Sequence, residues 1–380
     1  MNDVQNINYE SGEDCFSKTS NVKSYLLYGD QSRIESPLFT VFIPTFQRTE
    51  LFKEALLSVL RQWHVPFFWD IVVVDNEPYD GTINETEKFI RELDNPRILY
   101  YRNSENLRPG DNFNRGFLLA RGKWIMMLHD DDILFDNSLY NMYKIIKFLK
   151  KEISKPLGAV SVKYHQFKYD PQFPDKHKQE LVNAHNYYLS LPINYSLYKL
   201  THKQIIFTGH IGGDIPSNGA TYNRKAVIET GGFNENFGIS GDLILYYCLE
   251  NKYAVYSTLV PFGFYRWGIN TMSKPESIYQ TIKAGYEFRE YVYNKNIFNK
   301  IWGYLFRKSQ HRRFVINVMQ LEKKVLKTKC SINNYSDICD IKPNKHIYVF
   351  YSLIIKFLFE QIKAWQVKRL YKKSLNYKED

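Results

Sequence analysis

Three short apolar runs, each closed by polar residues, place the strongest constraint on how this 380-residue chain can fold. They are Phe39–Ile43, Ile71–Val74 and Lys123–Leu128. Nearly continuous apolar runs of this length predict strands that are buried on both faces. Segments with apolar residues at helical spacing lie between them, as at residues 49–60. This alternation predicts an α/β fold with a mostly parallel sheet flanked by helices.

The polar residues at the ends of these runs predict one ligand site. In parallel sheets covered by helices, ligands bind beyond the carboxyl ends of the strands. Pro44 and Thr45 end the first run, Asp75 and Asn76 follow the second, and Asp130–Asp132 follow the third. We therefore expect all three clusters to meet at one edge of the sheet.

The three adjacent aspartates at residues 130–132 predict a metal site. Neighbouring carboxylates at the end of a buried strand repel one another, and a bound cation offsets that repulsion. Hard cations such as Mg²⁺ or Mn²⁺ are held by one or two carboxylates and shared with substrate phosphates. The alternative is a solvated acidic turn, with Asp136 capping the next helix. If the strand continues, His129 falls on the side opposite Asp130. We therefore expect His129 to be a packing residue, or to support the ligands, rather than to be a metal ligand itself.

Charge and composition narrow the possible partners. The formal net charge of +11 predicts an anionic partner: a nucleotide, a nucleic acid or an anionic membrane. No recognised nucleic-acid-binding module is present in the sequence, so nucleic acid is not expected. The four cysteines lack the close spacing of a zinc site and fit a reduced compartment. We expect neither a signal peptide nor a membrane-spanning helix, and therefore a cytoplasmic protein.

The sequence predicts three regions. Residues 1–36 are polar, with little periodicity, and predict a loosely packed extension. Residues 37–273 hold the predicted catalytic domain, in which residues 168–203 are an insertion without an assigned structure. Residues 274–380 are helical, basic and aromatic in character. Within them, residues 347–373 predict an amphipathic helix, which either packs on the catalytic domain or lies on an anionic membrane.

Four motifs together resemble the family 2 glycosyltransferases. They are FTVFIPTFQR at residues 39–48, IVVVDN at 71–76, MLHDDDIL at 127–134 and GGFN…GD at 231–242, in the order seen in that family. The similarity covers about residues 38–270. It implies the GT-A fold, a Rossmann-like nucleotide-sugar-binding sheet, and inverting transfer of a sugar from a nucleotide-diphosphate sugar to a hydroxyl.

The resemblance also implies a role for individual residues. Asn76 stands where the family often has an aspartate that reads the base, which leaves the base open, with a UDP-sugar as the first expectation. The residues that it assigns to the nucleotide are Pro44, Thr45, Phe46, Arg48, Asp75, Asn76, Asp130 and Asp131. Among the carboxylates, Asp132 and Asp130 are the expected ligands of Mn²⁺ or Mg²⁺.

Asp242 matches the aspartate that supplies the catalytic base in the family, although Gly241 stands where a glutamate is usual. A positioned carboxylate can take the proton of an attacking hydroxyl, and a cation stabilises the leaving diphosphate. An aspartate at a helix start is also favourable in itself. Arg266 and Asn270 fall near the family segment that closes over the diphosphate, where a histidine is often found and is absent here.

These inferences predict a metal-dependent hexosyltransferase, peripheral on the inner face of the cell membrane. Its acceptor would be a glycan or a lipid-linked oligosaccharide of a bacterial-type surface polysaccharide. The alternative is a non-catalytic, glycosyltransferase-like scaffold that binds nucleotide, which Gly241 and the absent histidine favour. A nucleotidyltransferase is disfavoured because residues 44–48 contain no glycine-rich phosphate loop.

Overall fold

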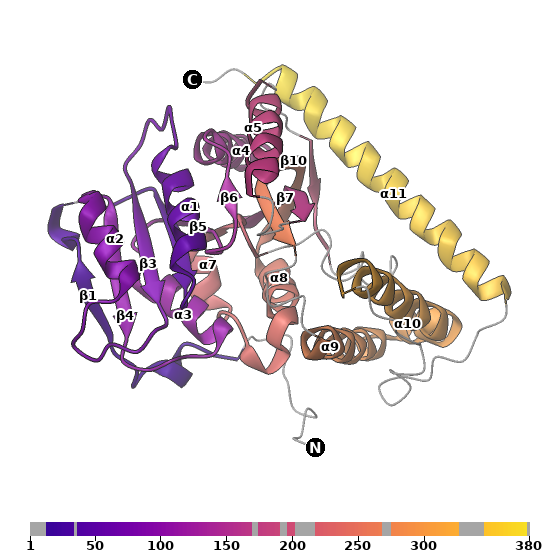
Figure 1. The fold of residues 1–380 in the computed structure, drawn as a ribbon. Coiled ribbons are helices and arrows are strands. Elements are labelled where there is room, and N and C mark those ends of the chain that lie inside the picture. Colours follow the sequence, from indigo (N-terminus) through magenta and orange to yellow (C-terminus); the bar gives the residue numbers. More distant parts are fainter. Residues whose placement is uncertain are drawn as a thin grey trace.

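The computed structural model describes residues 13–33, 36–168, 174–190, 196–201, 217–267, 275–326 and 346–377. A ten-stranded sheet forms the centre, in the order β1-β4-β3-β2-β5-β9-β7-β10-β6, and β8 pairs with β10 (Figure 1). The strands are β1 (Ser24–Tyr28), β2 (Phe39–Thr45), β3 (Trp69–Asp75), β4 (Ile98–Asn103), β5 (Trp124–Met127), β6 (Ile133–Leu134), β7 (Leu157–Lys168), β8 (Leu197–Lys199), β9 (Thr221–Asn223) and β10 (Ala254–Trp267).

The helices follow the expected alternation. Those of the sheet region are η2 (Ser17–Thr19), η3 (Gln31–Arg33), α1 (Thr49–Leu60), α2 (Glu85–Leu93), α3 (Pro109–Leu119), α4 (Ser138–Glu152), α5 (Pro174–Ser190), α7 (Arg224–Glu229), η4 (Glu235–Ser240) and α8 (Gly241–Lys252). Three longer helices complete the described chain: α9 (Pro275–Asn294), α10 (Ile297–Leu326) and α11 (His346–Leu375).

The parallel part of the sheet brings the predicted polar clusters to one edge. β4, β3, β2 and β5 are parallel neighbours, and Thr45 at the end of β2 pairs in register with Asp75 at the end of β3. The acidic turn that follows β5 lies at the same edge, since Asp130 accepts a hydrogen bond from the Thr45 hydroxyl at the end of β2. β9 runs antiparallel between β5 and β7, and β7 pairs in parallel with β10. The predicted α/β class with a mostly parallel sheet is therefore confirmed.

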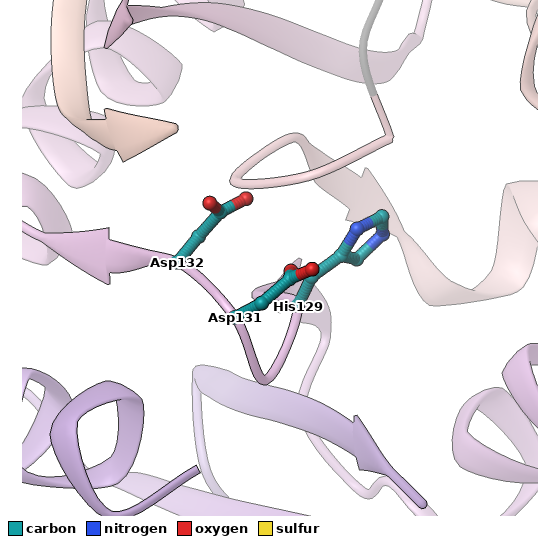
Figure 2. A group of neighbouring side chains, drawn as sticks. All are labelled: His129, Asp131 and Asp132. Carbon is teal, nitrogen blue, oxygen red and sulfur yellow. The ribbon is translucent and has the colours of Figure 1, made fainter. Parts of the chain in front are cut away.

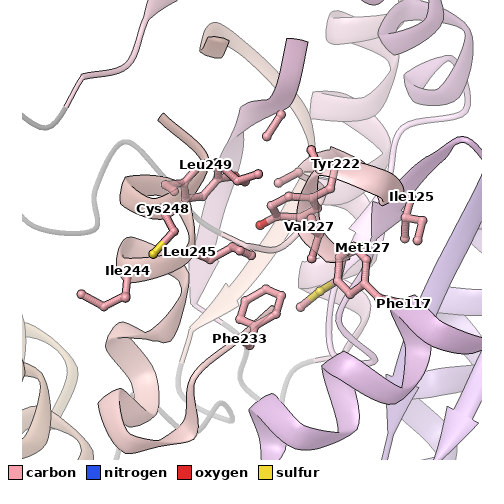
Figure 3. Packing of buried hydrophobic residues seen from close by; sticks show 14 of the residues in the cluster. Phe117, Ile125, Met127, Tyr222, Val227, Phe233, Ile244, Leu245, Cys248 and Leu249 are labelled. Atoms are coloured by element: carbon pink, nitrogen blue, oxygen red, sulfur yellow. The ribbon is translucent and has the colours of Figure 1, made fainter. Parts of the chain in front are cut away.

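Alternating strand residues contribute to two apolar layers. In β3, Val72 and Val74 join the cluster that contains α3, α7 and α8, whereas Ile71 and Val73 join the cluster with α1, α2 and α4. The first cluster packs Leu245 and Leu249 of α8 with side chains of β5 and α3 (Figure 3). Because both faces are covered, the central residues of β2, β3 and β5 are apolar on both sides, as the sequence indicated.

The predicted loose packing of residues 1–36 is wrong for the described part of that segment. β1 pairs antiparallel with β4 and forms one end of the sheet. Ahead of it, Cys15, Phe16 and Val22 are buried. The segment is polar overall, but a few apolar side chains suffice to dock it, because the sheet edge supplies backbone partners.

Two further segments can be compared with the predictions from the sequence. The unassigned stretch 168–203 contains α5 and β8 in its described part. In the alternative of a solvated acidic turn, Asp136 was to cap the next helix, but Asn137 occupies the cap position of α4 and makes no side-chain capping hydrogen bond. Asp136 lies instead 3.3 Å from Arg61 and 3.3 Å from His185 of α5.

The two cysteines among the described residues have low reactivity. Cys15 and Cys248 are buried free thiols, and burial raises the pKa of each to about 11. Such thiols are weak nucleophiles at neutral pH. Cys330 and Cys339 lie outside the described residues.

The C-terminal region is helical where it is described. α9 and α10 pack against each other, and α11 runs along the outer side of the molecule beside β8 and α10 (Figure 1). Val367, Leu370 and Tyr377 attach the end of α11 and the residues after it to the two apolar layers. Within the described residues, none of the helices combines the length and hydropathy needed to cross a bilayer. The division of the chain at residues 37 and 274 remains a prediction.

Candidate active site

The turn from β5 to β6 carries the acidic residues. β5 is fully buried, and its chain turns at once, because the backbone N–H of Asp132 donates to the carbonyl of His129 at 3.2 Å. This turn places His129, Asp131 and Asp132 side by side (Figure 2). One ligand atom from each of the three lies within 4.8 Å of the others.

The chemistry of this group fits a divalent cation. Burial raises the pKa of Asp132 well above its usual value, and the adjacent charge of Asp131 raises it further. Burial lowers the pKa of His129, so its imidazole is neutral and can offer a lone pair. Carboxylates suit Mg²⁺ and Mn²⁺, and an imidazole is a good ligand for transition metals. A cation between these groups would relieve the carboxylate repulsion.

Asp130 lies outside this group of three. It accepts a hydrogen bond from the Thr45 hydroxyl at 2.9 Å and lies 3.5 Å from the Arg48 guanidinium. Burial and the neighbouring Asp131 raise the pKa of Asp130 to about 7. That Asp130 binds the metal beside Asp132 remains a prediction. His129 stacks on the Phe113 ring with 5.7 Å between ring centroids, as expected of a packing residue, and its imidazole also lies beside Asp131 and Asp132 because the chain turns after β5.

Arg48 joins the first strand to the acidic turn. Its guanidinium donates to Asp131 at 3.0 Å while one third of its side chain stays exposed. Phe46, two residues earlier, is also exposed, and its backbone N–H donates to Asp130. The structure thus brings Thr45, Phe46 and Arg48 together with Asp130 and Asp131, and a cationic group faces the edge where a diphosphate is expected.

The side chains of Asp75 and Asn76 form hydrogen bonds with other residues of the chain. Asp75 accepts hydrogen bonds from the Tyr100 hydroxyl at 2.7 Å and the Asn84 amide at 2.9 Å, and burial raises its pKa. The Asn76 amide donates to the side chain of Asn106 at 2.7 Å and accepts from the backbone N–H of Leu107 at 2.9 Å. Both residues therefore fix the loops that border the site. Their contact with a nucleotide remains a prediction.

Asp242 lies in the first turn of α8. Burial raises the pKa of its carboxyl to about 7, and the backbone N–H groups of Leu243 and Ser217 oppose that rise. The Leu243 N–H lies 2.7 Å from the carboxylate. A carboxyl with a pKa near neutrality is well suited to accept a proton at physiological pH.

One short turn, Ser217–Gly219, connects Asp242 to the group of three. The Ser217 hydroxyl lies 3.4 Å from Nε2 of His129, and the Ser217 backbone N–H donates a hydrogen bond to the Asp242 carboxylate. The amide oxygen of Asn218 accepts the backbone N–H of His129 at 2.8 Å, and its NH₂ donates to the Asp132 carboxylate. Sequence reasoning missed both residues. Their only signal was the turn chemistry of Ser-Asn-Gly before a strand.

Gly219 is required in this turn. Its φ is +63°, a region that side chains rarely adopt, and a Cβ here would overlap the Tyr164 hydroxyl. Its N–H donates to the carbonyl of Met127 at the end of β5. The close approach of Gly219 to β7 and β5 holds the turn against the acidic residues.

β10 closes the site from the far side. The backbone N–H of Arg266 donates to the Asp132 carboxylate at 2.9 Å, and its guanidinium pairs with Glu54 of α1. The guanidinium points toward α1, yet its positive charge still favours the ionised form of Asp132. A contact between Arg266 and the diphosphate remains a prediction. Asn270 lies outside the described residues.

Comparison with known proteins identifies relatives of this site and fold. Residues 40–229, about half of the chain, match the family model "Glycosyl transferase family 2". The putative colanic acid biosynthesis glycosyl transferase WcaA of Escherichia coli K12 is 31% identical over 104 residues, 27% of this chain and 36% of that protein. Abequosyltransferase RfbV of Salmonella typhimurium LT2 is 34% identical over 102 residues, 27% of this chain and 30% of that protein. The chain thus spans about a third of the length of these relatives.

Solved structures share the fold. Staphylococcus aureus TarS 1–349, in complex with UDP-GlcNAc, superposes with a TM-score of 0.51 at 14% sequence identity. The superposition covers 88% of this chain and 92% of that one. At this identity the likeness concerns the fold, which is GT-A. Together with the family match over the strands that carry the acidic turn, it leads to one conclusion: the chain belongs to glycosyl transferase family 2.

Proposed function

We propose that the chain is an inverting, metal-dependent glycosyltransferase that moves a sugar from a nucleotide-diphosphate sugar to a hydroxyl of a glycan or lipid-linked acceptor. The observation that carries the proposal is the grouping of His129, Asp131 and Asp132, tied by the turn at residues 217–219 to Asp242. A candidate metal-binding group and a candidate base are therefore linked through one turn at the ligand edge of the sheet.

His129, Asp131 and Asp132 would hold Mn²⁺ or Mg²⁺, which would neutralise charge on the leaving diphosphate. Arg48 adds a partly exposed guanidinium beside Asp131 and can contact the same diphosphate. Asp130 holds Thr45 and Arg48 in place through its two oxygens. The first strand and the acidic turn then act as one binding surface.

Asp242 takes the proton of the attacking hydroxyl. With a pKa of about 7, the Asp242 carboxyl is ionised in roughly half of the molecules at neutral pH. Attack from the side of Asp242, opposite the leaving diphosphate, gives direct displacement with inversion. Asp242 is then protonated, and the bond from the sugar carbon to the diphosphate is broken.

A UDP-sugar is the first donor to test, because TarS was captured with UDP and with UDP-GlcNAc. WcaA is named as a putative colanic acid biosynthesis glycosyl transferase, and RfbV is named as an abequosyltransferase. A further relative, from Campylobacter jejuni, is 30% identical over 106 residues and is named as a GalNAc(5)-diNAcBac-PP-undecaprenol beta-1,3-glucosyltransferase. These names support a surface-polysaccharide acceptor. For a lipid-linked acceptor of that kind, we further propose a cytoplasmic enzyme that is peripheral on the inner face of the membrane.

The test is a calorimetric titration of UDP, GDP, dTDP and CDP into the full chain, with and without Mn²⁺. We expect one nucleotide to bind in a metal-dependent way and Asp132→Ala to abolish this binding. Asp136→Ala is the matched control, because Asp136 is a nearby carboxylate that pairs with Arg61 and lies outside the metal group. Absence of binding to all four nucleotides would refute the proposal. Binding without transfer to any acceptor would favour the non-catalytic scaffold.

A further inference from the structure

The first turns of α10 carry an exposed apolar stripe. Ile297, Phe298, Ile301 and Tyr304 recur on one side of the helix, and Phe298 and Tyr304 are 81% and 89% exposed. Apolar side chains of this size rarely gather in water on a protein without a partner for them. The stripe was not apparent from the sequence, because the helix as a whole has no single apolar side.

The opposite side of α10 is firmly packed, so the stripe is not exposed by loose docking. The Trp302 and Phe306 rings lie 4.3 Å apart, and Phe306 is buried. Gly303 fits closely against the Tyr293 ring of α9. Gln310 and His311 are also buried against α9. The orientation of α10 is thereby fixed, with its apolar stripe outward.

α11 repeats this arrangement. Its inner side reaches the two apolar layers, while Phe350, Leu353, Phe357 and Trp365 are each more than half exposed on the outer side. The exposed set is broader than the stripe expected from the sequence. α10 and α11 contact one another, so the two exposed faces belong to neighbouring helices.

Basic side chains accompany both apolar faces. The last turns of α11 expose Lys368, Arg369, Lys372 and Lys373. On α10, Lys300 lies exposed within the stripe. Exposed aromatic and aliphatic side chains followed by lysine and arginine are the composition of helices that lie at a bilayer surface, where rings enter the interface and cations meet anionic headgroups.

We propose that the exposed faces of α10 and α11 form a docking surface for an anionic lipid bilayer. The inference rests on the proposed function, in which a lipid-linked acceptor lies at that bilayer. A second copy of the chain fits less well, because it would set basic residues of α11 against another strongly basic surface in a protein of net charge +11. Anionic headgroups complement the same residues.

The test is co-sedimentation of the full chain with phosphatidylcholine vesicles, alone or with about one quarter phosphatidylglycerol. We expect binding to the anionic vesicles, weakened by salt, and little binding to phosphatidylcholine. Phe298→Ser with Tyr304→Ser should weaken binding by roughly tenfold or more. Lys368→Gln with Lys372→Gln should weaken it by about fivefold for each lysine. Phe68→Ser is the matched control, since Phe68 is 64% exposed on the catalytic domain.

Nucleotide titration of the same samples separates the two proposals. Variants that lose vesicle binding but keep nucleotide binding support the docking surface, and vesicle binding by a chain that takes no nucleotide would refute only the transferase. Equal binding by the α10 variant and wild type, or equal binding to both kinds of vesicle, would overturn the docking surface. So would a dimer in ultracentrifugation that the same substitutions disperse, in the absence of vesicle binding.

Discussion

Replacing Asn218 with alanine removes the side chain that ties the acidic turn to the rest of the site. The variant loses a charge-assisted hydrogen bond to the Asp132 carboxylate and a second bond to the His129 backbone N–H. A hydrogen bond to a charged group is worth about 1.5–3 kcal/mol. Loss of a group that orients a metal ligand typically weakens metal affinity by roughly 10–100-fold. We expect Mn²⁺-dependent nucleotide binding to weaken by an amount in this range.

The assay is a titration of Mn²⁺ into chain and nucleotide, with thermal unfolding measured in parallel. Asn223→Ala is the matched control, because Asn223 caps α7 through the N–H of Ala226 at 3.2 Å, without a contact to the acidic turn. Removal of a cap costs about 1 kcal/mol of stability, so both variants should unfold more easily. Only Asn218→Ala should lose metal affinity. Equal losses in the two variants, or unchanged affinity in Asn218→Ala, would refute the reasoning.

Three further predictions follow from named contacts. With saturating Mn²⁺, kcat/KM should rise roughly tenfold per pH unit below about pH 7 and level off above it, because Asp242 must be deprotonated to act as a base. Asp242→Asn should lower kcat/KM by a factor of about 10²–10⁴ and remove that pH dependence. Gly219→Ala should lower the free energy of unfolding by about 1–3 kcal/mol, and adding Tyr164→Phe should restore part of it in a denaturant titration, because the tyrosine hydroxyl is the nearest obstacle. Phe117→Ala should cost about 3–5 kcal/mol in the same titration, because its ring is fully buried between α3 and the sheet (Figure 3), whereas Phe68→Ala should change stability by less than about 0.5 kcal/mol. An unchanged pH profile in Asp242→Asn, no recovery on adding Tyr164→Phe, or equal effects of the two phenylalanine substitutions would each contradict the corresponding argument.

The parallel strands were predictable because strands buried on both faces consist mainly of apolar residues. β2 and β3 are buried at each position, so the apolar runs stood out without knowledge of their partners. β1 was not predictable by the same rule. It is a short edge strand of mixed exposure, and β4 supplies its pairing from 79 residues away along the chain at Ser24 and Asn103.

The sequence predicted at which edge of the sheet the site lies, but not which side chains contact one another within it. Strand ends identified the edge where Thr45 and Asp132 lie. Asp131 and His129 lie beside Asp132 because the chain turns after β5, where the Asp132 N–H donates to the His129 carbonyl, and periodicity does not encode such a turn. Asn218 acts on Asp132 across 86 residues of sequence, and no local pattern indicates such a contact.

The antiparallel strand β9 explains how the distant turn reaches the acidic residues. A strand parallel to β5 would bring its carboxyl end to the ligand edge, whereas β9 brings the residues that precede it. The hydrogen bond from the Met127 N–H to the Ala220 carbonyl, at 3.0 Å, continues that pairing beyond β9 and sets residues 217–219 beside the end of β5. From there Asn218 holds Asp132 and Ser217 holds Asp242. The direction of one short strand thus places the turn that links the candidate base to the candidate metal-binding group. A substitution that disturbs the pairing of β9 with β5 should therefore impair both groups together.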